Sequence, residues 1–438
     1  MSFIFFIKAI QFFLSLSIIV ILHELGHYIP ARIFNTRVER FFLFFDVKYA
    51  LFKKKIGETV YGVGWLPLGG YVKIAGMIDE SMDTEQMKKP PQPWEFRSKP
   101  TWQRLIIMLG GIIVNLLLGF LIFMMMFFVW GKNTLPNSSI PLGLGVSKLA
   151  EEVGFEKGDQ ILKVDGKVID IPTSLSKKFF LENVNEVEVL RSNGRKEVLT
   201  IPGDIDERMF QSGEMDLFYV RTPALIDSIL PNSPAEISGL QVGDKIKSIN
   251  NTIITDWGDL NKWKTENDLR EFDLTIERRR SEKTLKIKLG EQSIIGVFPK
   301  PIELKNVSLS LFQSISEGYN YAYSTLYGYV ASFKFVFTKK GAQQLGGFGT
   351  IGGLFPSEWD WRGFWSTTAF ISIILAFMNL LPIPALDGGH VMFLIYEMIT
   401  GRKPADKFLE YATTLGFILL LALVLYANGN DIYRAITQ

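Results

Sequence analysis

The sequence predicts a membrane α-helical protein with four transmembrane helices, a membrane-associated β-hairpin and two small α+β repeats. Three observations indicate this fold class. Four apolar stretches are long enough to cross or nearly cross a bilayer, a more polar region separates the second from the third, and that region repeats itself. The mean hydropathy of +0.18 and the 35 phenylalanines among 438 residues also favour an integral membrane protein.

Composition excludes several classes of function. The formal net charge of +2 is too small to suggest a nucleic-acid partner, and no basic stripe with interleaved aromatics is present. The chain has no cysteine, so disulfides, thiolate ligands and a cysteine nucleophile are excluded. Any metal site must therefore use histidine and carboxylate ligands.

The predicted elements follow one another in a fixed order along the chain. Transmembrane helices are expected over residues 1–33, 105–130, 364–390 and 408–427. The first of these has one early positive charge and no small-residue cleavage site, so we interpret it as a retained span rather than a signal peptide. The remaining segments are a loop at 34–104 with a hairpin at 57–76, repeats at 140–204 and 217–293, and an amphipathic helix at 308–340.

The amphipathic segment carries large apolar residues at helical spacing, which predicts a helix on the membrane surface or against the bundle. The residues are Leu309, Phe312, Ile315, Tyr319, Ala322, Leu326, Tyr329, Phe333 and Phe337. We expect this aromatic stripe to pack. The glycine-rich segment 346–353 that follows is predicted to be a flexible linker or hinge.

Basic residues in the flanks of the spans predict the orientation, because cytoplasmic loops are enriched in lysine and arginine. The two flanks richest in them contain Arg32, Arg37, Arg40 and Lys48, and Lys88, Lys89, Arg97, Lys99 and Arg104. These flanks should be cytoplasmic. Both termini and the central repeats should then lie outside.

A metal-hydrolase signature, His23-Glu24-Leu25-Gly26-His27, lies near the end of the first apolar stretch. Residues four apart share a helix face about 6 Å apart along the axis, so His23 and His27 can offer two imidazoles to one zinc ion. Glu24 would then lie beside the metal, where it could take a proton from water and deliver it to a leaving amine. Short matches of this kind also arise by chance, but ionisable residues inside apolar segments usually mark functional sites.

The third ligand is expected from the segment Asn379 to His390, where prolines and glycines interrupt an apolar helix. Asp387 can supply an anionic ligand, while Asn379 can donate hydrogen bonds to a substrate or to an oxyanion. Two alternatives stay open: Asp387 as a turn-former, and His390 as the ligand in its place. We expect His390 to border the site.

The central repeat is visible when residues 150–161 are aligned with residues 235–246, which places Asp159 opposite Asp244. The segments Ser233-Pro234-Ala235-Glu236 and Gly239 to Asp244 resemble tandem PDZ domains of the bacterial protease-associated kind. The first copy lacks the Ser-Pro pair. PDZ modules bind peptide ends by strand addition, although two spacer or cover domains would give the same pattern.

The HExxH in the first span, the Asn-x-x-Pro-x-Pro-x-Leu-Asp-Gly in the third and the PDZ-like repeats together resemble the site-2 protease family, in its bacterial regulator-of-sigma-E protease branch. The resemblance covers nearly the whole chain. It implies that His23, His27 and Asp387 bind one zinc ion and that Glu24 is the catalytic acid and base. It also implies a bacterial inner membrane location, periplasmic repeats, and cleavage near the cytoplasmic face.

The same resemblance gives meaning to the predicted hairpin at 57–76. In the family such a segment dips into the membrane and pairs with a substrate unwound into a strand, which here would involve Gly62, Gly64, Gly69, Gly70 and Tyr71. An ordinary surface hairpin would also fit the pattern.

Three further residues have supporting roles in this prediction. Asn115, in the Gly111-x-x-x-Asn115 element of the second span, could hydrogen-bond the first helix or simply pack between helices. Pro382 and Pro384 would hold the broken helix open beside the site.

The sequence thus predicts a zinc intramembrane endopeptidase acting on single-span membrane proteins, such as an anti-sigma-type regulator or remnant signal peptides. Its partners would be the transmembrane substrate, the lipid bilayer and peptide ends held by the PDZ-like repeats. A catalytically inactive, membrane-anchored PDZ adaptor is the alternative. A metal or ion transporter is a further one, but it would need more polar residues across the spans.

Overall fold

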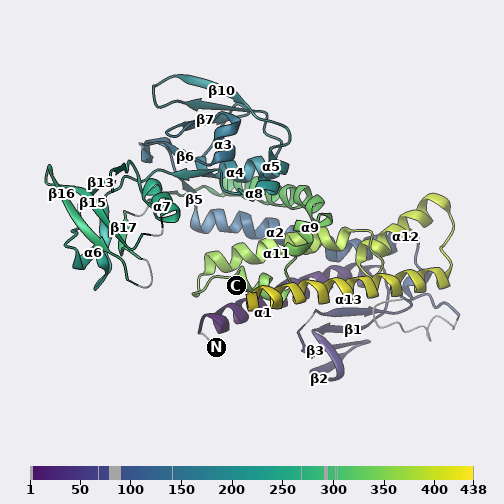
Figure 1. Cartoon of the computed structure of the whole chain (residues 1–438). Helices are drawn as coiled ribbons and strands as arrows, with labels where there is room; N and C mark the ends of the chain where they lie inside the picture. The colour runs from purple at the N-terminus through teal and green to yellow at the C-terminus, as the bar shows by residue number, and fades with distance from the viewer. Residues whose placement is uncertain are drawn as a thin grey trace. The chain divides into compact units, whose positions relative to one another are not determined.

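The computed structural model describes residues 3–67, 69–77, 90–140, 142–267, 269–290, 294–300, 302 and 304–437. The chain forms two compact units (Figure 1). Unit 1 comprises Met1–Gly131 and Ser308–Gln438, and unit 2 comprises Lys132–Val307.

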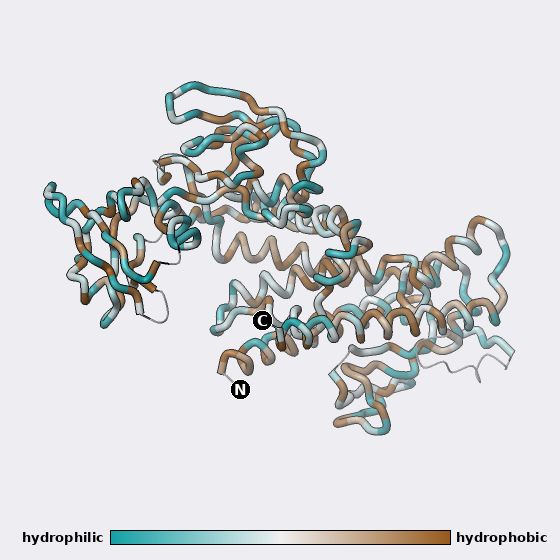
Figure 2. Tube along the Cα trace, viewed as in Figure 1, coloured by the Kyte–Doolittle hydropathy of each residue, from teal (hydrophilic) through white to brown (hydrophobic). Residues whose placement is uncertain are grey.

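Unit 1 contains four helices long and apolar enough to cross a membrane, as the sequence predicts. They are α1 (Phe3–Ile33), α2 (Thr101–Trp130), α11 (Trp361–Leu380) and α13 (Asp406–Thr437). Hydrophobic residues dominate along these helices, whereas unit 2 alternates between hydrophobic and hydrophilic (Figure 2). Many of their large apolar side chains are exposed in the structure, above all on α1, α2 and α13, as a lipid-facing surface requires.

The third span is shorter than expected because its helix breaks before Asp387. Helix α11 ends at Leu380, and the chain resumes as α12 (Asp387–Thr400). Pro382 and Pro384 lie in this break, where each lacks an N–H donor and restricts the preceding residue to extended backbone. The break therefore places Asp387 at the first position of a new helix instead of in the middle of a span.

Helix α2 is the centre of unit 1, since α1, α8 (Leu311–Ser332), α11 and α12 all pack against it. It lies close to α1, where Gly26 and Gly110 leave no room for side chains: a Cβ on either would collide with the carbonyl of the other. Small residues allow two helix backbones to approach in this way inside a membrane.

A four-stranded sheet follows α1 in the order β2-β3-β1-β4. Its strands are β1 (Val38–Leu43), β2 (Phe45–Ile56), β3 (Thr59–Leu66) and β4 (Tyr71–Ile74). Strand β1 pairs parallel with β3 and antiparallel with β4. The expected hairpin at 57–76 is therefore wrong in its pairing, because β1 lies between β3 and β4. Leu68, within that segment, lies outside the described residues.

The amphipathic segment forms α8, η5 (Phe333–Phe337) and α9 (Lys339–Gln344). The side of α8 that is buried carries small residues, Ser314, Gly318, Ala322, Thr325 and Gly328. The predicted packing of the aromatic stripe is only partly correct: Tyr319 and Phe120 form a T-shaped ring pair, but Phe312 is 83% exposed. Small residues lie at the interface because they allow α8 to approach α2, where Gly318 contacts Met124.

The glycine-rich segment is ordered instead of forming a free linker. It includes α10 (Phe348–Gly353), whose first turn is held by α13. The Asp431 carboxylate accepts hydrogen bonds from the backbone N–H groups of Gly347 and Thr350, each at 3.0 Å. A helix N-terminus favours an anionic side chain at this place.

Unit 2 consists of two modules of the same topology, in agreement with the repeat seen in the sequence. The first module contains β6 (Leu144–Val146), α3 (Lys148–Val153), β7 (Gln160–Val164), β8 (Lys167–Val168), α4 (Leu175–Leu181), β9 (Glu186–Leu190), β10 (Lys196–Thr200), α5 (Ile205–Ser212) and β11 (Phe218–Val220). The second contains β12 (Ile226–Ile229), α6 (Pro234–Ile237), β13 (Lys245–Ile249), β14 (Thr252–Ile253), α7 (Trp257–Glu266), β15 (Glu271–Arg278), β16 (Ser281–Lys288) and β17 (Val297–Pro299). Their sheets have equivalent orders, β10-β9-β7-β8 and β16-β15-β13-β14, and each module has its own apolar core.

The two modules repeat the same buried ion pair. Asp159 pairs with Arg191 at 2.8 Å, and its equivalent Asp244 pairs with Arg278 at 2.7 Å. Each aspartate is 1% exposed and also accepts a hydrogen bond from the backbone N–H three residues before it. Asp159 and Asp244, which align in the sequence repeat, thus have the same structural role in each module.

Four charged residues join the two modules. Lys157 of the first contacts Asp256 at 3.1 Å and Asp259 at 2.6 Å, and Arg221 donates to Asp256 at 2.7 Å. Both aspartates lie at the start of α7, where they form a capping box. Burial alone would raise the pKa of Asp259, but hydrogen bonds from Lys157 and Thr255 outweigh it and lower the pKa to about 2.

We predict that Lys157→Met loosens the junction by about 1 kcal/mol, the usual range for a partly exposed ion pair. Hydrogen exchange of the α7 amides at pH 7 should be faster in this variant. Because the folded-state pKa of Asp259 is depressed from 3.8 to about 2, the contribution is complete above about pH 4 and lost as the pH falls through about 2. Lys262→Met, at an exposed lysine of the same helix, is the control, and equal exchange in both variants would contradict the prediction.

Candidate metal centre

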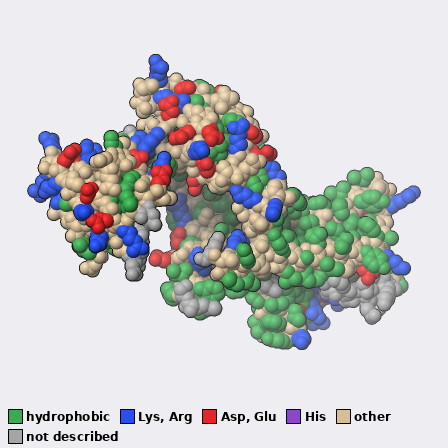
Figure 3. Space-filling view, in the orientation of Figure 1, with side chains coloured by type: hydrophobic (Ala, Val, Ile, Leu, Met, Phe, Trp, Pro, Cys, Tyr) green, Lys and Arg blue, Asp and Glu red, His purple; other side chains and the backbone are tan. Residues whose placement is uncertain are grey.

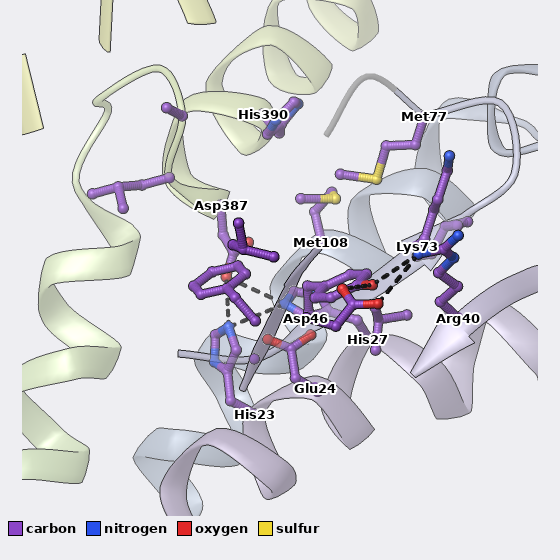
Figure 4. Close-up of a pocket in the computed structure, with 18 residues that line it drawn as sticks. His23, Glu24, His27, Arg40, Asp46, Lys73, Met77, Met108, Asp387 and His390 are labelled. Carbon is purple, nitrogen blue, oxygen red and sulfur yellow. Dashed lines mark hydrogen bonds and ion pairs between the residues drawn. The ribbon is translucent and has the colours of Figure 1, made fainter. Parts of the chain in front are cut away.

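The described part of unit 1 contains a cavity of about 390 Å³ at the C-terminal part of α1. Its walls come from α1, the sheet, α2 and the start of α12 (Figure 4). The lining residues that carry charge or can bind metal are His23, Glu24, His27, Arg40, Asp46, Lys73, Asp387 and His390.

Three candidate ligand atoms converge at one point of this cavity. The Nε2 atoms of His23 and His27 lie 3.2 Å apart, and they lie 3.3 and 3.4 Å from Asp387 Oδ2. Tetrahedral coordination at the zinc–ligand distances of about 2.0–2.1 Å would separate ligand atoms by about 3.3 Å. The three atoms therefore already have the spacing of three corners of a zinc site.

The hydrogen bonds of these side chains also fit a metal ion. Asp387 Oδ2 is buried and accepts no hydrogen bond from the described residues. His27 Nδ1 lies 2.8 Å from the carbonyl oxygen of Ile107, to which it can only donate. The Nε2 lone pair of His27 is thereby directed toward the cavity, as in histidine ligands whose other nitrogen is held by a carbonyl.

Asn115 is the hydrogen-bond partner of His23 Nδ1, as the Ile107 carbonyl is of His27 Nδ1. Its side-chain amide nitrogen lies 3.2 Å from His23 Nδ1, while its Oδ1 is buried and receives no hydrogen bond from the described residues. Rotation of the amide by about 180° would turn Oδ1 toward His23, where it could accept the Nδ1 proton. The backbone of Asn115 is fixed in turn by the hydroxyl of Ser372, which donates to its carbonyl at 2.7 Å.

Glycines create the space for the two imidazoles and for the start of α12. A Cβ on Gly111 would collide with His27 Nε2 and lie 2.6 Å from His23 Cε1. A Cβ on Gly389 would lie 2.6 Å from Pro384 Cα. Ala385 has φ +85°, a left-handed conformation that costs an alanine free energy, and it turns the chain two residues before Asp387.

Glu24 lies between the ligand group and the sheet (Figure 4). The backbone N–H of Val72 on β4 interacts with its carboxylate. A base here faces both the ligand group and β4, the last strand of the sheet in the described part of the chain.

The structure brings together only part of the predicted site. His23, Glu24, His27, Asp387, Gly70 and Tyr71 line the cavity, and His390 borders it as expected but lies outside the ligand group. Asn379, Pro382 and Pro384 are absent from the lining, as are Gly62, Gly64 and Gly69. Gly62 and Gly64 instead pack inside the sheet, where a Cβ would collide with Phe42 and Phe45 respectively.

Sequence reasoning missed Val72, Lys73 and Ile74, which line the cavity, and the carbonyl of Ile107. In the sequence, Val72, Lys73 and Ile74 could have been recognised by their position in the strand that follows Gly69-Gly70. A backbone carbonyl has no signal in the sequence.

The fold and the site define a membrane protein with a metal-dependent hydrolase centre. Comparison with known families gives the same result: the chain belongs to peptidase family M50, whose model matches residues 11–423. The regulator of sigma-E protease RseP of Escherichia coli is 27% identical over 97% of this chain and 98% of its own length. A relative from Campylobacter jejuni, named as a zinc metalloprotease, is 27% identical over 97% of this chain and 93% of its own. The protein is therefore a metalloprotease, and zinc is its metal.

We predict that Gly111→Ala lowers zinc affinity about 10- to 100-fold, the effect typical of disturbing groups around metal ligands. The added methyl group would displace the imidazoles of His23 and His27. Zinc content measured during competition with a chelator tests this. Gly352→Ala adds the same methyl group where nothing lies within 4 Å, so it should bind zinc normally; equal affinities would show that Gly111 does not set the ligand spacing.

Proposed function

We propose that this protein is an intramembrane endopeptidase that hydrolyses a peptide bond within the transmembrane segment of a single-span protein. The observation that carries the proposal is the convergence of His23, His27 and Asp387 at one point, with Glu24 beside them. The motif that supplies two of these ligands lies on a helix able to span a bilayer.

Each residue of the site has a distinct role in this proposal. Zinc bound by His23, His27 and Asp387 supplies Lewis-acid chemistry, which polarises a carbonyl or a water molecule. Glu24 takes the proton of the attacking water and delivers it to the leaving amine. Asn115 and the Ile107 carbonyl hold the two imidazoles in the tautomer that points Nε2 at the metal.

Strand β4 is the candidate surface for the unwound substrate. Peptide bonds inside a helix are shielded, so cleavage requires a local extended stretch whose hydrogen bonds must be replaced. Strand β3 cannot replace them because β2 and β1 occupy both its edges, whereas β4 pairs with β1 alone among the strands that the structure describes. A substrate strand added at β4 would lie along the wall of the cavity that contains Glu24.

The proposal includes the direction in which the site faces. The basic flanks Arg32 to Lys48 and Lys88 to Arg104 favour a cytoplasmic position for the C-terminal end of α1, in a bacterial inner membrane. Peptide binding by the PDZ-like modules stays a prediction, and so do the substrates named above. The proposal assigns no step to Asn379.

We predict that Glu24→Gln leaves zinc bound but lowers cleavage of a labelled transmembrane substrate at least about 100-fold, because the amide cannot accept the proton of water. Purified protein in detergent with gel-based detection of the product provides the measurement. Glu410→Gln, the same change on α13, should cleave normally. Full turnover by the Glu24→Gln variant would refute the assigned role.

We predict that Val72→Pro lowers kcat/KM for the same substrate about tenfold, because it removes the main-chain N–H that interacts with the Glu24 carboxylate, a hydrogen bond of about 1.4 kcal/mol. Val72→Ala keeps the N–H and removes only side-chain atoms, so it should stay close to the wild-type enzyme. Zinc content must be the same in both variants. Equal cleavage by the two variants would exclude a role for the Val72 N–H in positioning Glu24.

A further inference from the structure

Three consecutive lysines lie on the free edge of the unit 1 sheet. Lys53, Lys54 and Lys55 belong to β2, whose only partner among the described strands is β3. All three are exposed, and none forms an ion pair with a described acidic residue. An uncompensated cluster of this kind attracts a polyanionic partner.

Apolar and aromatic side chains lie next to these lysines. Leu51, Phe52 and Ile56 are 67%, 61% and 58% exposed. Tyr49 stacks on Trp65 with ring centroids 5.8 Å apart, and the Trp65 indole N–H donates to the carbonyl of Val47. Figure 3 shows basic side chains beside hydrophobic ones at the lower edge of the molecule, over this sheet.

Contacts with α1 fix the position of this edge relative to the membrane. Arg32, in the last turn of α1, lies 4.0 Å from Glu58 in the turn between β2 and β3. One turn earlier, the hydroxyls of Tyr28 and Tyr61 lie 2.7 Å apart. The lysines therefore lie at the level where a transmembrane helix ends, and their surroundings continue its lipid-facing surface, since Ile29 and Ile33 are also exposed.

We propose that this surface, Tyr49 to Ile56 with Trp65, binds the head groups of anionic phospholipids at the membrane surface. Aromatic residues favour the head-group region, and lysines next to a transmembrane helix attract anionic lipids. Neighbouring side chains of a strand point to opposite faces. Lys53 and Lys55 can thus contact phosphate on one face of the strand. On the other face, which Lys54 shares, Phe52 and Ile56 can contact acyl chains.

Lipid retention by the purified full-length protein tests the proposal without any use of proteolytic activity. The protein is equilibrated in micelles with equal amounts of phosphatidylglycerol and phosphatidylcholine, and native mass spectrometry counts the molecules of each that stay bound. The wild-type protein should retain an excess of phosphatidylglycerol. In the triple variant K53Q/K54Q/K55Q this excess should be at least about fivefold smaller, since each lysine near the surface contributes to the attraction.

Three controls separate charge from other causes. K53R/K54R/K55R keeps the charge and should keep the excess, while K196Q/K283Q/K288Q removes three exposed lysines of unit 2 and should behave as the wild type. Raising the salt concentration should weaken the wild-type excess through screening. An unchanged excess in K53Q/K54Q/K55Q, an arginine variant that loses it, or insensitivity to salt would each overturn the proposal.

Discussion

The structure of unit 1 depends on holding three electron-pair donors at one buried point. Two imidazole nitrogens and a carboxylate oxygen lie within 3.4 Å of one another, an arrangement that a zinc ion between them would stabilise. The site assembles because α2 contacts both the helix with the histidines and the helix with the aspartate. Gly110 allows α1 to approach, and Gly111 leaves space for the imidazoles.

The broken helix is the second requirement of this arrangement. In an unbroken span every backbone N–H and C=O group would be hydrogen-bonded, but the helix would carry Asp387 past the histidines. A break leaves some of these groups without helical partners, so inside a membrane it must be surrounded by protein. Here α12 begins where Gly388 and Gly389 pack on the carbonyls of the break, and α13 passes at Gly416 against the carbonyl of Pro384. Buried Arg104 of α2 pairs with Glu397 of α12 at 2.6 Å, which holds the other end of the same helix.

The sequence predicts those features that depend on the interval between residues of a single helix. A four-residue interval brings His23 and His27 together on any helix, and two prolines must break α11. Strand pairing is different, because an alternating pattern does not say which strand lies beside it. The pattern therefore predicts an open edge at Gly62 and Gly64, although β1 and β2 lie on both sides of their strand. The same limit explains the misplaced face of α8, where the need for close approach outweighed the burial of aromatic side chains.

X-ray absorption of bound zinc, with metal content, tests the central claim that Asp387 completes the site. The wild-type protein should show one zinc per chain with two imidazole ligands and oxygen in the remaining positions, and His390→Ala should leave both results unchanged because His390 lies outside the ligand group. Asp387→Ala should lose zinc at chelator concentrations that the wild-type protein withstands. Zinc retained with an unaltered spectrum in Asp387→Ala, or lost in His390→Ala, would contradict the account.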